Sequence, residues 1–274
     1  MITSSIVLYK TKLTDLRSVL RCAAESCIDV IYVIDNSPTD ALRQEVLAFD
    51  SQKIVYIHGH GNIGYGAGNN IGIEKAIASG SKYHIVLNAD IIFEPEVIRA
   101  MEVFMDGHND IGQLLPKVTY PDGSLQRLCK LLPTPLDIFG RRLLPAKMVE
   151  SRNAEYEMHF TDYEHVRNCP LLSGCFMFLR TDTLKEVGVF DDRFFMYFED
   201  FDLMRRIHAV AKTVYYPELT IIHNHAAEHR TNKTLLKISV QSAVKYFNKW
   251  GWLFDSERRR VNRAAHSEEN VIRD

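Results

Sequence analysis

Short apolar runs alternate with helical patterns through the first part of the chain, and this alternation limits its fold more than any other feature. The apolar runs cover residues 4–9, 30–35, 54–58 and 83–88. The intervening segments with apolar residues at helical spacing are 13–24, 41–48 and 70–78. The pattern predicts an α/β fold with a parallel sheet covered by helices. Ligands of such sheets bind at the carboxyl ends of the strands.

The remainder of the chain is less regular. Residues 95–105 are expected to form a helix and residues 112–118 an edge strand. Residues 129–165 contain three prolines and no sustained period, which predicts a long mobile segment over the ligand site. Further strands are expected at 171–180, 213–216 and 219–223, and helices at 181–187, 198–209 and 234–250. We therefore expect one domain over residues 1–225. Residues 226–274 are expected to form a helical extension that packs on this domain and ends in a charged, loose tail.

Charge and cysteine content exclude several classes of protein. Thirty-three Lys and Arg against 35 Asp and Glu leave a net charge of -2, which removes the electrostatic argument for a nucleic-acid binder. The five cysteines include no C-x-x-C pair, so neither a disulfide framework nor a ribbon-type zinc site is indicated. The N-terminus lacks the pattern of a signal peptide, and no apolar run approaches roughly 18 residues. We expect a cytoplasmic protein that at most contacts a membrane surface.

Polar residues follow the predicted strands. Asp90 comes directly after the apolar run 84–87, where a rigid strand on one side and solvent on the other suit a hard cation and its phosphates. A strand that ends in an aspartate capping the next turn is the ordinary alternative.

A glycine-rich stretch at residues 59–70 leads into a helix that is expected to begin near Asn70. Glycines let backbone N–H groups approach a diphosphate, and a helix N-terminus favours the same charge. Gly59, Gly61 and Gly64 match G-x-G-x-x-G, which supports a competing interpretation as an NAD(P)-dependent oxidoreductase with Asp90 on the ribose. Asp90, however, lies 26 residues after Gly64, later than the usual spacing of about 20. A simple glycine-rich surface turn is the third interpretation.

An acidic cluster follows a run of large apolar side chains at residues 194–198. A carboxylate beside an apolar wall can be desolvated and tuned as a base. On a helix that begins near Glu199, Asp202 and Arg206 stand four residues apart and can pair, which leaves Asp200 on another face. An acidic helix N-terminus stabilised by the dipole is the ordinary explanation for Glu199 and Asp202.

Two histidines, His223 and His225, follow the last predicted strand. Alternate residues of an extended segment face the same side, so these two side chains are candidates for a shared metal or phosphate site. Exposed loop histidines are the usual alternative.

Taken in order, these pieces resemble the inverting nucleotide-sugar glycosyltransferases of family 2, in the GT-A fold group, and in particular their rhamnosyltransferase-like bacterial members. The matching positions are Val7-Leu8-Tyr9, Asp35-Asn36-Ser37, Asn62-Ile63-Gly64, Gly68-Asn69-Asn70-Ile71-Gly72, Leu87-Asn88-Ala89-Asp90, Ser173-Gly174-Cys175 with Arg180, and Gly188-Val189-Phe190-Asp191 through Asp202-Leu203 to Arg206. They span residues 5 to about 225. The resemblance implies a mixed, mainly parallel Rossmann-like sheet with a C-terminal helical extension.

The resemblance also implies roles for particular residues. The positions implied to receive the donor nucleotide are Tyr9, Asp35, Asn36, Asn62, Gly64, Asn69 and Asn88. Asp90 corresponds to the metal-binding aspartate of the family's D-x-D motif, and His223, or else His225, is implied to assist it. Asp200 corresponds to the catalytic base with Glu199 beside it, and Arg206 supports the diphosphate or the structure. Because Asn88 replaces the first aspartate, we expect the metal to have one direct carboxylate ligand.

The implied function is transfer of a sugar, rhamnose in the favoured version, from a dTDP- or UDP-sugar with Mg²⁺ or Mn²⁺. A glycan or lipid-linked glycan of cell-surface polysaccharide such as O-antigen is the expected acceptor. The lysines of residues 233–249 with Phe247, Trp250 and Trp252 are candidates for contact with the inner face of the membrane. A helix that packs on the core or forms a homodimer is the alternative. A non-catalytic nucleotide-sugar-binding protein is the remaining functional class.

Overall fold

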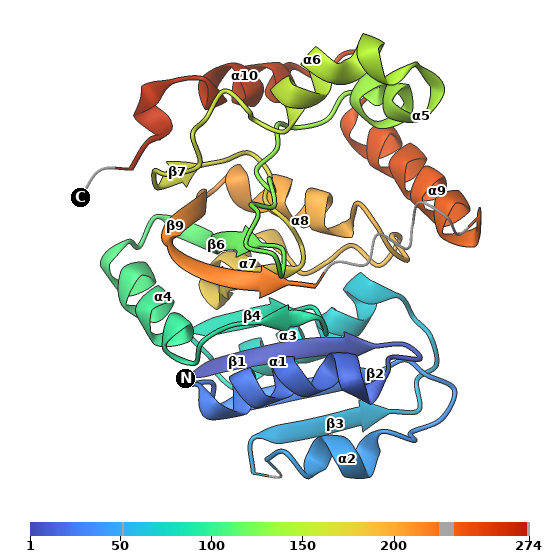
Figure 1. Ribbon diagram of the computed structural model, residues 1–274, viewed down its shortest axis with the longest axis vertical. Helices are drawn as coiled ribbons and strands as arrows, with labels where there is room; N and C mark the ends of the chain where they lie inside the picture. Colours follow the sequence, from blue (N-terminus) through green and yellow to red (C-terminus); the bar gives the residue numbers. More distant parts are fainter. Residues whose placement is uncertain (51, 225–232, 273–274) are drawn as a thin grey trace.

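A computed structural model describes residues 1–50, 52–224 and 233–272. In these residues one mixed sheet has the strand order β3-β2-β1-β4-β8-β6-β9-β5, with β7 paired to β9 (Figure 1). The strands are β1 Ile2–Leu8, β2 Val30–Asp35, β3 Ile54–His58, β4 Tyr83–Leu87, β5 Ile91–Ile92, β6 Ile111–Thr119, β7 Arg167–Asn168, β8 Phe176–Arg180 and β9 Lys212–His223. The helices are α1 Leu13–Glu25, α2 Arg43–Leu47, α3 Tyr65–Ala78, α4 Glu96–Gly107, α5 Arg141–Leu143, α6 Ala146–Tyr156, α7 Thr181–Val187, α8 Glu199–His208, α9 Lys233–Trp250 and α10 Ser256–Ala265.

The predicted α/β architecture with a Rossmann-like, mainly parallel sheet is confirmed. Strands β1 to β4 pair in parallel. The side chains of β1, β2 and β4 are almost all buried, which explains the apolar runs in the sequence, whereas β3 lies at the edge of the sheet and is partly exposed. The carboxyl ends of these parallel strands therefore meet at one edge, where the polar residues that follow them gather. The second half of the sheet adds antiparallel neighbours, because β8 runs opposite to both β4 and β6.

Two strand predictions are wrong in detail. Strand β6 was expected at an edge, but it lies between β8 and β9 because the chain returns after residue 165 to cover its free side. The two short strands expected at 213–216 and 219–223 form the single strand β9. Pro217 interrupts the apolar pattern, and the register with β6 jumps from Tyr216 to Thr220 at that point.

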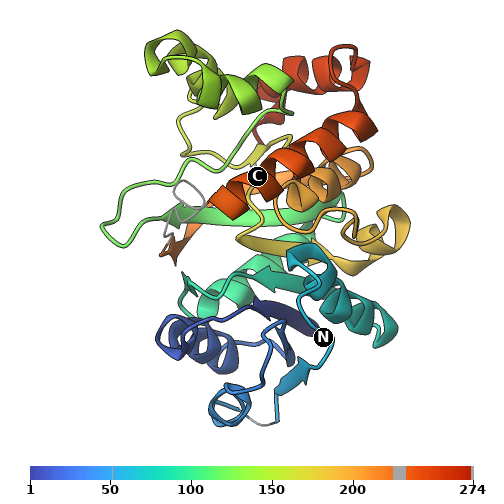
Figure 2. The ribbon, with the colours of Figure 1, turned by 90° about the vertical axis from the view of Figure 1, so that its right-hand side faces the viewer.

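The segment expected to be long and mobile is instead structured. Residues 136–140 form a π-helical turn that continues into α5 and α6. Tyr156, Met158 and Tyr163 are buried, and Arg152 pairs with Asp137 at 2.6 Å. Pro135 and Pro145 directly precede the π-helical turn and α6, and the short length of these helices explains why no long period is visible in the sequence. Together with α10, these helices form a layer at the end of the molecule opposite to β3 and α2 (Figures 1 and 2).

The C-terminal region packs on the sheet domain, and the expected loose tail is wrong. Helix α9 lies beside α8 in Figure 2, and α10 is capped by Asp255, which accepts a hydrogen bond from the Arg258 backbone. Asp255 also forms a buried bidentate pair with Arg205 of α8 at 2.8 Å. This pair ties the last described helix to the domain. The boundary expected at residue 225 lies outside the described residues.

Two of the aromatic residues expected to contact a membrane are used inside the protein. Phe247 is fully buried against Phe194 and Phe198, and the Trp250 indole donates a 2.8 Å hydrogen bond to Asp202. In the same region Leu253 is 74% exposed and Phe254 is 86% exposed. No helix in the described ranges is both long and apolar enough to span a membrane.

Candidate active site

The carboxyl edge of the sheet begins with the residues after β1 and β2. Tyr9 is about half exposed, so its ring is open to a ligand, whereas Asp35 and Asn36 are almost fully buried. Asp35 accepts hydrogen bonds from the Tyr56 hydroxyl and from the backbone N–H of Ser37. The Asn36 amide donates to the Gly64 carbonyl at 3.0 Å. Asp35 and Asn36 thus hold the strand end and the glycine loop in position, while Tyr9 offers the open surface.

Gly64 is required by packing. Its φ is +92°, and a Cβ atom there would lie 2.2 Å from the Phe195 carbonyl oxygen. The next residue, Tyr65, donates its backbone N–H to the same oxygen at 2.9 Å. Helix α3 consequently begins at Tyr65, earlier than the predicted start near Asn70. The glycine loop is docked on the segment before Asp200, which brings two distant motifs of the sequence together.

Asn62 and Asn69, both expected in the donor pocket, differ in exposure. Asn62 is exposed, and its side chain accepts from the Gly64 N–H at 3.3 Å. Asn69, expected to line the donor pocket, is instead fully buried; it accepts from Ser5 at 2.6 Å and donates to the Tyr65 carbonyl at 3.1 Å. Because both ends of the Asn69 amide are used internally, this side chain joins α3 to β1.

Asn88 and Tyr65 connect the carboxyl edge of the sheet to the Ser173-Gly174-Cys175 turn. The Tyr65 hydroxyl lies 2.7 Å from Asn88 Oδ1 and 3.0 Å from the Gly174 carbonyl oxygen. The Asn88 backbone N–H donates to the Cys175 carbonyl at 2.9 Å. Sequence reasoning did not single out Tyr65, and only the folded chain brings its hydroxyl to these partners.

Asp90 and His223 lie together, as their roles in the resemblance require. His223 Nε2 is 3.4 Å from Asp90 Oδ1, and His223 Nδ1 is 3.0 Å from the Gln126 side-chain oxygen. Burial lowers the pKa of His223, but hydrogen bonds with Asp90 and Cys175 outweigh it and raise that pKa to about 10. His225 lies outside the described residues.

These two side chains fit a divalent cation only in part. Within the described ranges, no group of three or more His, Cys, Asp or Glu side chains is arranged to hold a metal. Mg²⁺ is commonly held by one or two carboxylates together with substrate phosphates and water. Asp90 suits that arrangement, and a bound diphosphate would supply further oxygens. His223 would join as a ligand only by releasing the proton that its raised pKa retains.

A strained turn sets the direction of the acidic cluster. Tyr197 and Phe198 both have left-handed backbone conformations, with φ of +67° and +69°, directly before α8. Such conformations cost about 1–3 kcal/mol each and tend to cluster at active sites. The turn places Glu199 inside the protein and Asp200 against the Ser173-Gly174-Cys175 turn.

Glu199 and Asp200 have different surroundings. Glu199 is 4% exposed, and its Oε2 atom has no hydrogen-bond partner among the described residues. Burial and the neighbouring Asp200 charge raise the pKa of Glu199 to about 8. Asp200 is partly exposed and accepts from the backbone N–H groups of Gly174 at 3.2 Å and Phe201 at 2.9 Å. Burial raises the pKa of Asp200, while these N–H groups and the Lys130 charge oppose the rise.

Asp202 and Arg206 serve the scaffold. Their predicted pairing is confirmed at 3.0 Å, and Asp202 is fully buried. Arg206 also donates to the backbone carbonyls of Val187 and Val189 at 2.6 and 2.8 Å. Because these contacts occupy its guanidinium, Arg206 fits the expected structural role and not the alternative role at the diphosphate.

Lys130 is a site residue that sequence reasoning missed. It lies in the segment expected to be mobile, and its ammonium is 5.8 Å from the centre of the Phe201 ring. No motif marks Lys130 in the sequence. Its position follows from an isolated backbone bridge to Leu171, which aligns it with the segment that leads to Gly174.

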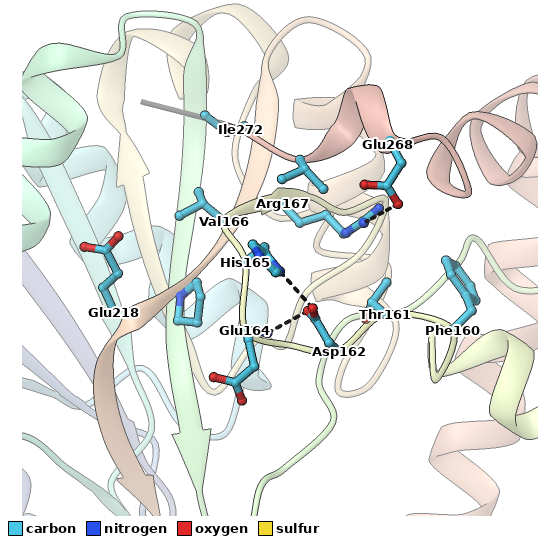
Figure 3. A pocket seen from close by; sticks show the side chains of 12 residues that line it. Phe160, Thr161, Asp162, Glu164, His165, Val166, Arg167, Glu218, Glu268 and Ile272 are labelled. Carbon is cyan, nitrogen blue, oxygen red and sulfur yellow. Dashed lines mark hydrogen bonds and ion pairs between the residues drawn. The ribbon is translucent and has the colours of Figure 1, made fainter.

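A separate cavity of about 430 Å³ contains none of the predicted site residues (Figure 3). It lies between the 160–167 segment and the C-terminal residues 268–272. Two ion pairs lie within the cavity wall, His165 with Asp162 at 2.8 Å and Arg167 with Glu268 at 3.8 Å (Figure 3).

A glycine loop and an acidic strand end at the carboxyl edge of a mainly parallel sheet, facing a carboxylate at the start of a helix, define a glycosyltransferase of the GT-A fold. The chain belongs to glycosyltransferase family 2, whose family model matches residues 6–188. This match replaces the oxidoreductase interpretation. The need for a glycine at position 64 is explained by its close contact with the Phe195 carbonyl.

Two curated relatives are similar over most of the chain. The low-salt glycan biosynthesis hexosyltransferase Agl10 of Haloferax volcanii is 27% identical over 64% of this chain and 52% of its own length. The N-acetylglucosaminyl-diphospho-decaprenol L-rhamnosyltransferase of Mycobacterium tuberculosis is 28% identical over 78% of this chain and 71% of its own length. The chain thus spans about half of the first relative.

Solved structures agree on the fold. S. aureus TarS in complex with UDP-GlcNAc has a TM-score of 0.58 at 14% identity, covering 98% of this chain and 74% of its own. GalNAc-T7 with UDP, GalNAc and Mn²⁺ has a TM-score of 0.60 at 14% identity, covering 91% of this chain and 50% of its own.

Proposed function

We propose that this glycosyltransferase moves a sugar from a nucleoside-diphosphate donor to an acceptor hydroxyl in one inverting displacement, with Asp200 as the base. The observation that supports it best is the position of Asp200 at the start of α8. The carboxylate is held by two backbone N–H groups and lies beside the turn that contacts Asn88. Burial raises the pKa of Asp200, and a higher pKa makes a carboxylate a stronger base.

The reaction follows from the movement of charge. The acceptor oxygen forms a bond to the sugar C1 atom while its proton passes to Asp200. The bond between C1 and the diphosphate oxygen breaks, and its electron pair leaves with the nucleoside diphosphate. Because attack and departure occur on opposite faces, the anomeric centre inverts. A bound Mg²⁺ or Mn²⁺ would neutralise part of the charge on the leaving diphosphate.

We assign Glu199 a positioning role beside the base. Its raised pKa keeps it neutral at pH 7, so it lowers the negative charge around Asp200. A second carboxylate ionised next to Asp200 would repel an approaching diphosphate. When the surroundings of two neighbouring acids push their pKa values apart, the two acids usually have different roles in catalysis.

For the donor side we propose a dTDP- or UDP-sugar, with Tyr9, Asp35, Asn36, Asn62, Gly64 and Asn88 around the nucleotide and Asp90 with His223 at the metal. The UDP-GlcNAc and Mn²⁺ complexes of the two solved structures support a nucleotide sugar and a divalent cation. The rhamnosyltransferase relative supports rhamnose as the sugar and a lipid-linked glycan as the acceptor. An enzyme that transfers sugar to a lipid-linked glycan would act at the cytoplasmic face of a membrane.

The test replaces the base without changing its shape. Asp200→Asn should lower kcat by about 10²- to 10⁴-fold, while stabilisation of the protein by UDP with Mn²⁺ is kept. Release of UDP from a UDP-sugar panel with a lipid-linked sugar measures the first effect, and thermal unfolding measures the second. Asp192→Asn, an exposed neighbour, is the matched control and should behave like the native chain. Full turnover by the Asp200 variant would remove this residue from the role.

A further inference from the structure

Lys130 places a positive charge near the proposed base, where it opposes the rise in the pKa of Asp200 that burial causes. Its ammonium lies 5.8 Å from the ring centre of Phe201, the residue after Asp200, and 6.0 Å from that of Tyr156. In the described part of the chain no carboxylate forms an ion pair with Lys130. The charges of Arg141, Glu157 and Asp200 act on Lys130, while the faces of two aromatic rings cover it. An ammonium that is partly covered by rings and forms no ion pair is suited to receive an anion.

A second cation shares the same aromatic ring. The Arg141 guanidinium lies 4.9 Å from the centre of the Tyr156 ring. It is held there by Asn153 at 2.9 Å and by Glu157 at 2.7 Å. Burial and the Arg141 charge lower the pKa of Lys130, which means that the two cations repel each other. A bound phosphate or diphosphate would relieve this repulsion.

An apolar groove lies on the turn that precedes Arg141 in the chain. Gly140 is one of its lining residues, and the groove has a volume of about 570 Å³. The apolar side chains that line it are Leu136, Phe139, Leu143, Leu144, Trp252 and Leu253. Leu143 and Leu253 are 79% and 74% exposed, so the groove opens to the protein surface. Exposed apolar groups gathered in this way are typical of a binding surface.

We propose that Lys130, Arg141 and this groove form the acceptor site for a lipid-linked sugar. The phosphate or diphosphate that links sugar to lipid lies against Lys130 and Arg141, and the hydrocarbon chain lies in the groove. Along such a molecule, the reacting hydroxyl would lie at Asp200, the anion at Lys130 and Arg141, and the hydrocarbon in the groove that Gly140 lines. The assignment rests on the proposed function, because it takes Asp200 as the point where the acceptor hydroxyl reacts.

The probe is farnesyl diphosphate, a soluble isoprenyl diphosphate, and binding is followed by the fluorescence of the two tryptophans, of which Trp252 lines the groove. UDP and Mn²⁺ are present in excess so that the donor side is filled. We expect farnesyl diphosphate to bind more tightly than inorganic diphosphate or farnesol, since each of these offers only half of the contacts.

Matched variants separate the two halves of the site. Lys130→Met should weaken farnesyl diphosphate about tenfold or more, because a hydrogen bond to a charged group is lost, and Lys130→Arg should restore most of the binding. Leu253→Ser should weaken farnesyl diphosphate but leave inorganic diphosphate unchanged. Lys185→Met and Val103→Ser, exposed residues on α7 and α4, are the controls and should bind like the native chain.

Three results would overturn the assignment: displacement of farnesyl diphosphate by UDP, equal binding by Lys130→Met and the native chain, or binding only to phosphatidylglycerol vesicles. The last would make the groove a membrane contact. Binding of UDP and hydrolysis of UDP-sugars are measured in the same samples. Their failure would count against the proposed function, whereas loss of farnesyl diphosphate binding with UDP binding intact would count against the acceptor site alone.

Discussion

Replacement of Glu199 by Gln tests the separation of the two neighbouring acids. In the unfolded chain Glu199 releases its proton near its ordinary pKa of 4.5, whereas in the folded protein it keeps the proton up to a pKa of about 8. Between these values unfolding releases a proton, so the free energy of unfolding falls as pH rises. Gln at this position resembles the protonated carboxyl group and does not titrate.

The size of the effect follows from the shift. At about 1.4 kcal/mol per pKa unit, ionisation of Glu199 opposes folding by roughly 4 to 5 kcal/mol above pH 8. The stability of Glu199→Gln relative to the native chain should therefore rise by about 2 kcal/mol from about pH 6 to about pH 8. Urea unfolding at both pH values measures this difference, and Glu186→Gln on the exposed face of α7 is the control.

Activity provides the second measurement. Because Glu199 is already neutral at pH 7, Glu199→Gln should keep kcat within about tenfold of the native value, in contrast to Asp200→Asn. A stability difference that does not change with pH would refute the buried, neutral state of Glu199. Loss of transfer in Glu199→Gln as large as that in Asp200→Asn would refute the assignment of the base.

Three further predictions concern the packing and the metal. Gly64→Ala should destabilise the fold by about 3 kcal/mol or more in urea unfolding, because its Cβ would lie 2.2 Å from the Phe195 oxygen. The control Gly59→Ala should lose only about 1 to 2 kcal/mol, because Gly59 has a φ of +103° but no neighbour within 4 Å. Equal losses in the two variants would argue against the docked loop. Gly174→Ala places a Cβ 2.9 Å from Asp200 Oδ2 and should lower kcat by about 10- to 100-fold while UDP-dependent thermal stabilisation persists; an unchanged kcat would contradict the position of the base. Asp90→Asn should remove the part of UDP stabilisation that depends on Mn²⁺, measured by thermal unfolding with and without the ion, whereas Asp192→Asn should retain it.

Local pattern accounts for what was predicted correctly. Strands β1, β2 and β4 are buried on both faces and appear as apolar runs, so their type and order were visible in the sequence. Helix α7 was predicted with its observed bounds, Thr181–Val187, because its start and its final Gly188 are local signals. The family was also visible, since its motifs are short stretches kept in order.

The predictions that failed depended on neighbours far along the chain. The interior position of β6 requires β8 and β9 on its two sides, and the ordered 136–156 segment and tail depend on contacts such as Arg205 with Asp255. The apolar period within each segment carries no information about these partners.

The sequence by itself determined the α/β class, the family, and the two aspartates at the centre of the proposed chemistry. Tertiary structure alone decided which groups surround them: Phe195 against Gly64, Gln126 against His223, and Lys130 beside Asp200. The physical reason is that periodicity and caps act within a few residues, whereas burial, hydrogen bonding and charge at the site come from segments that only the folded chain brings together.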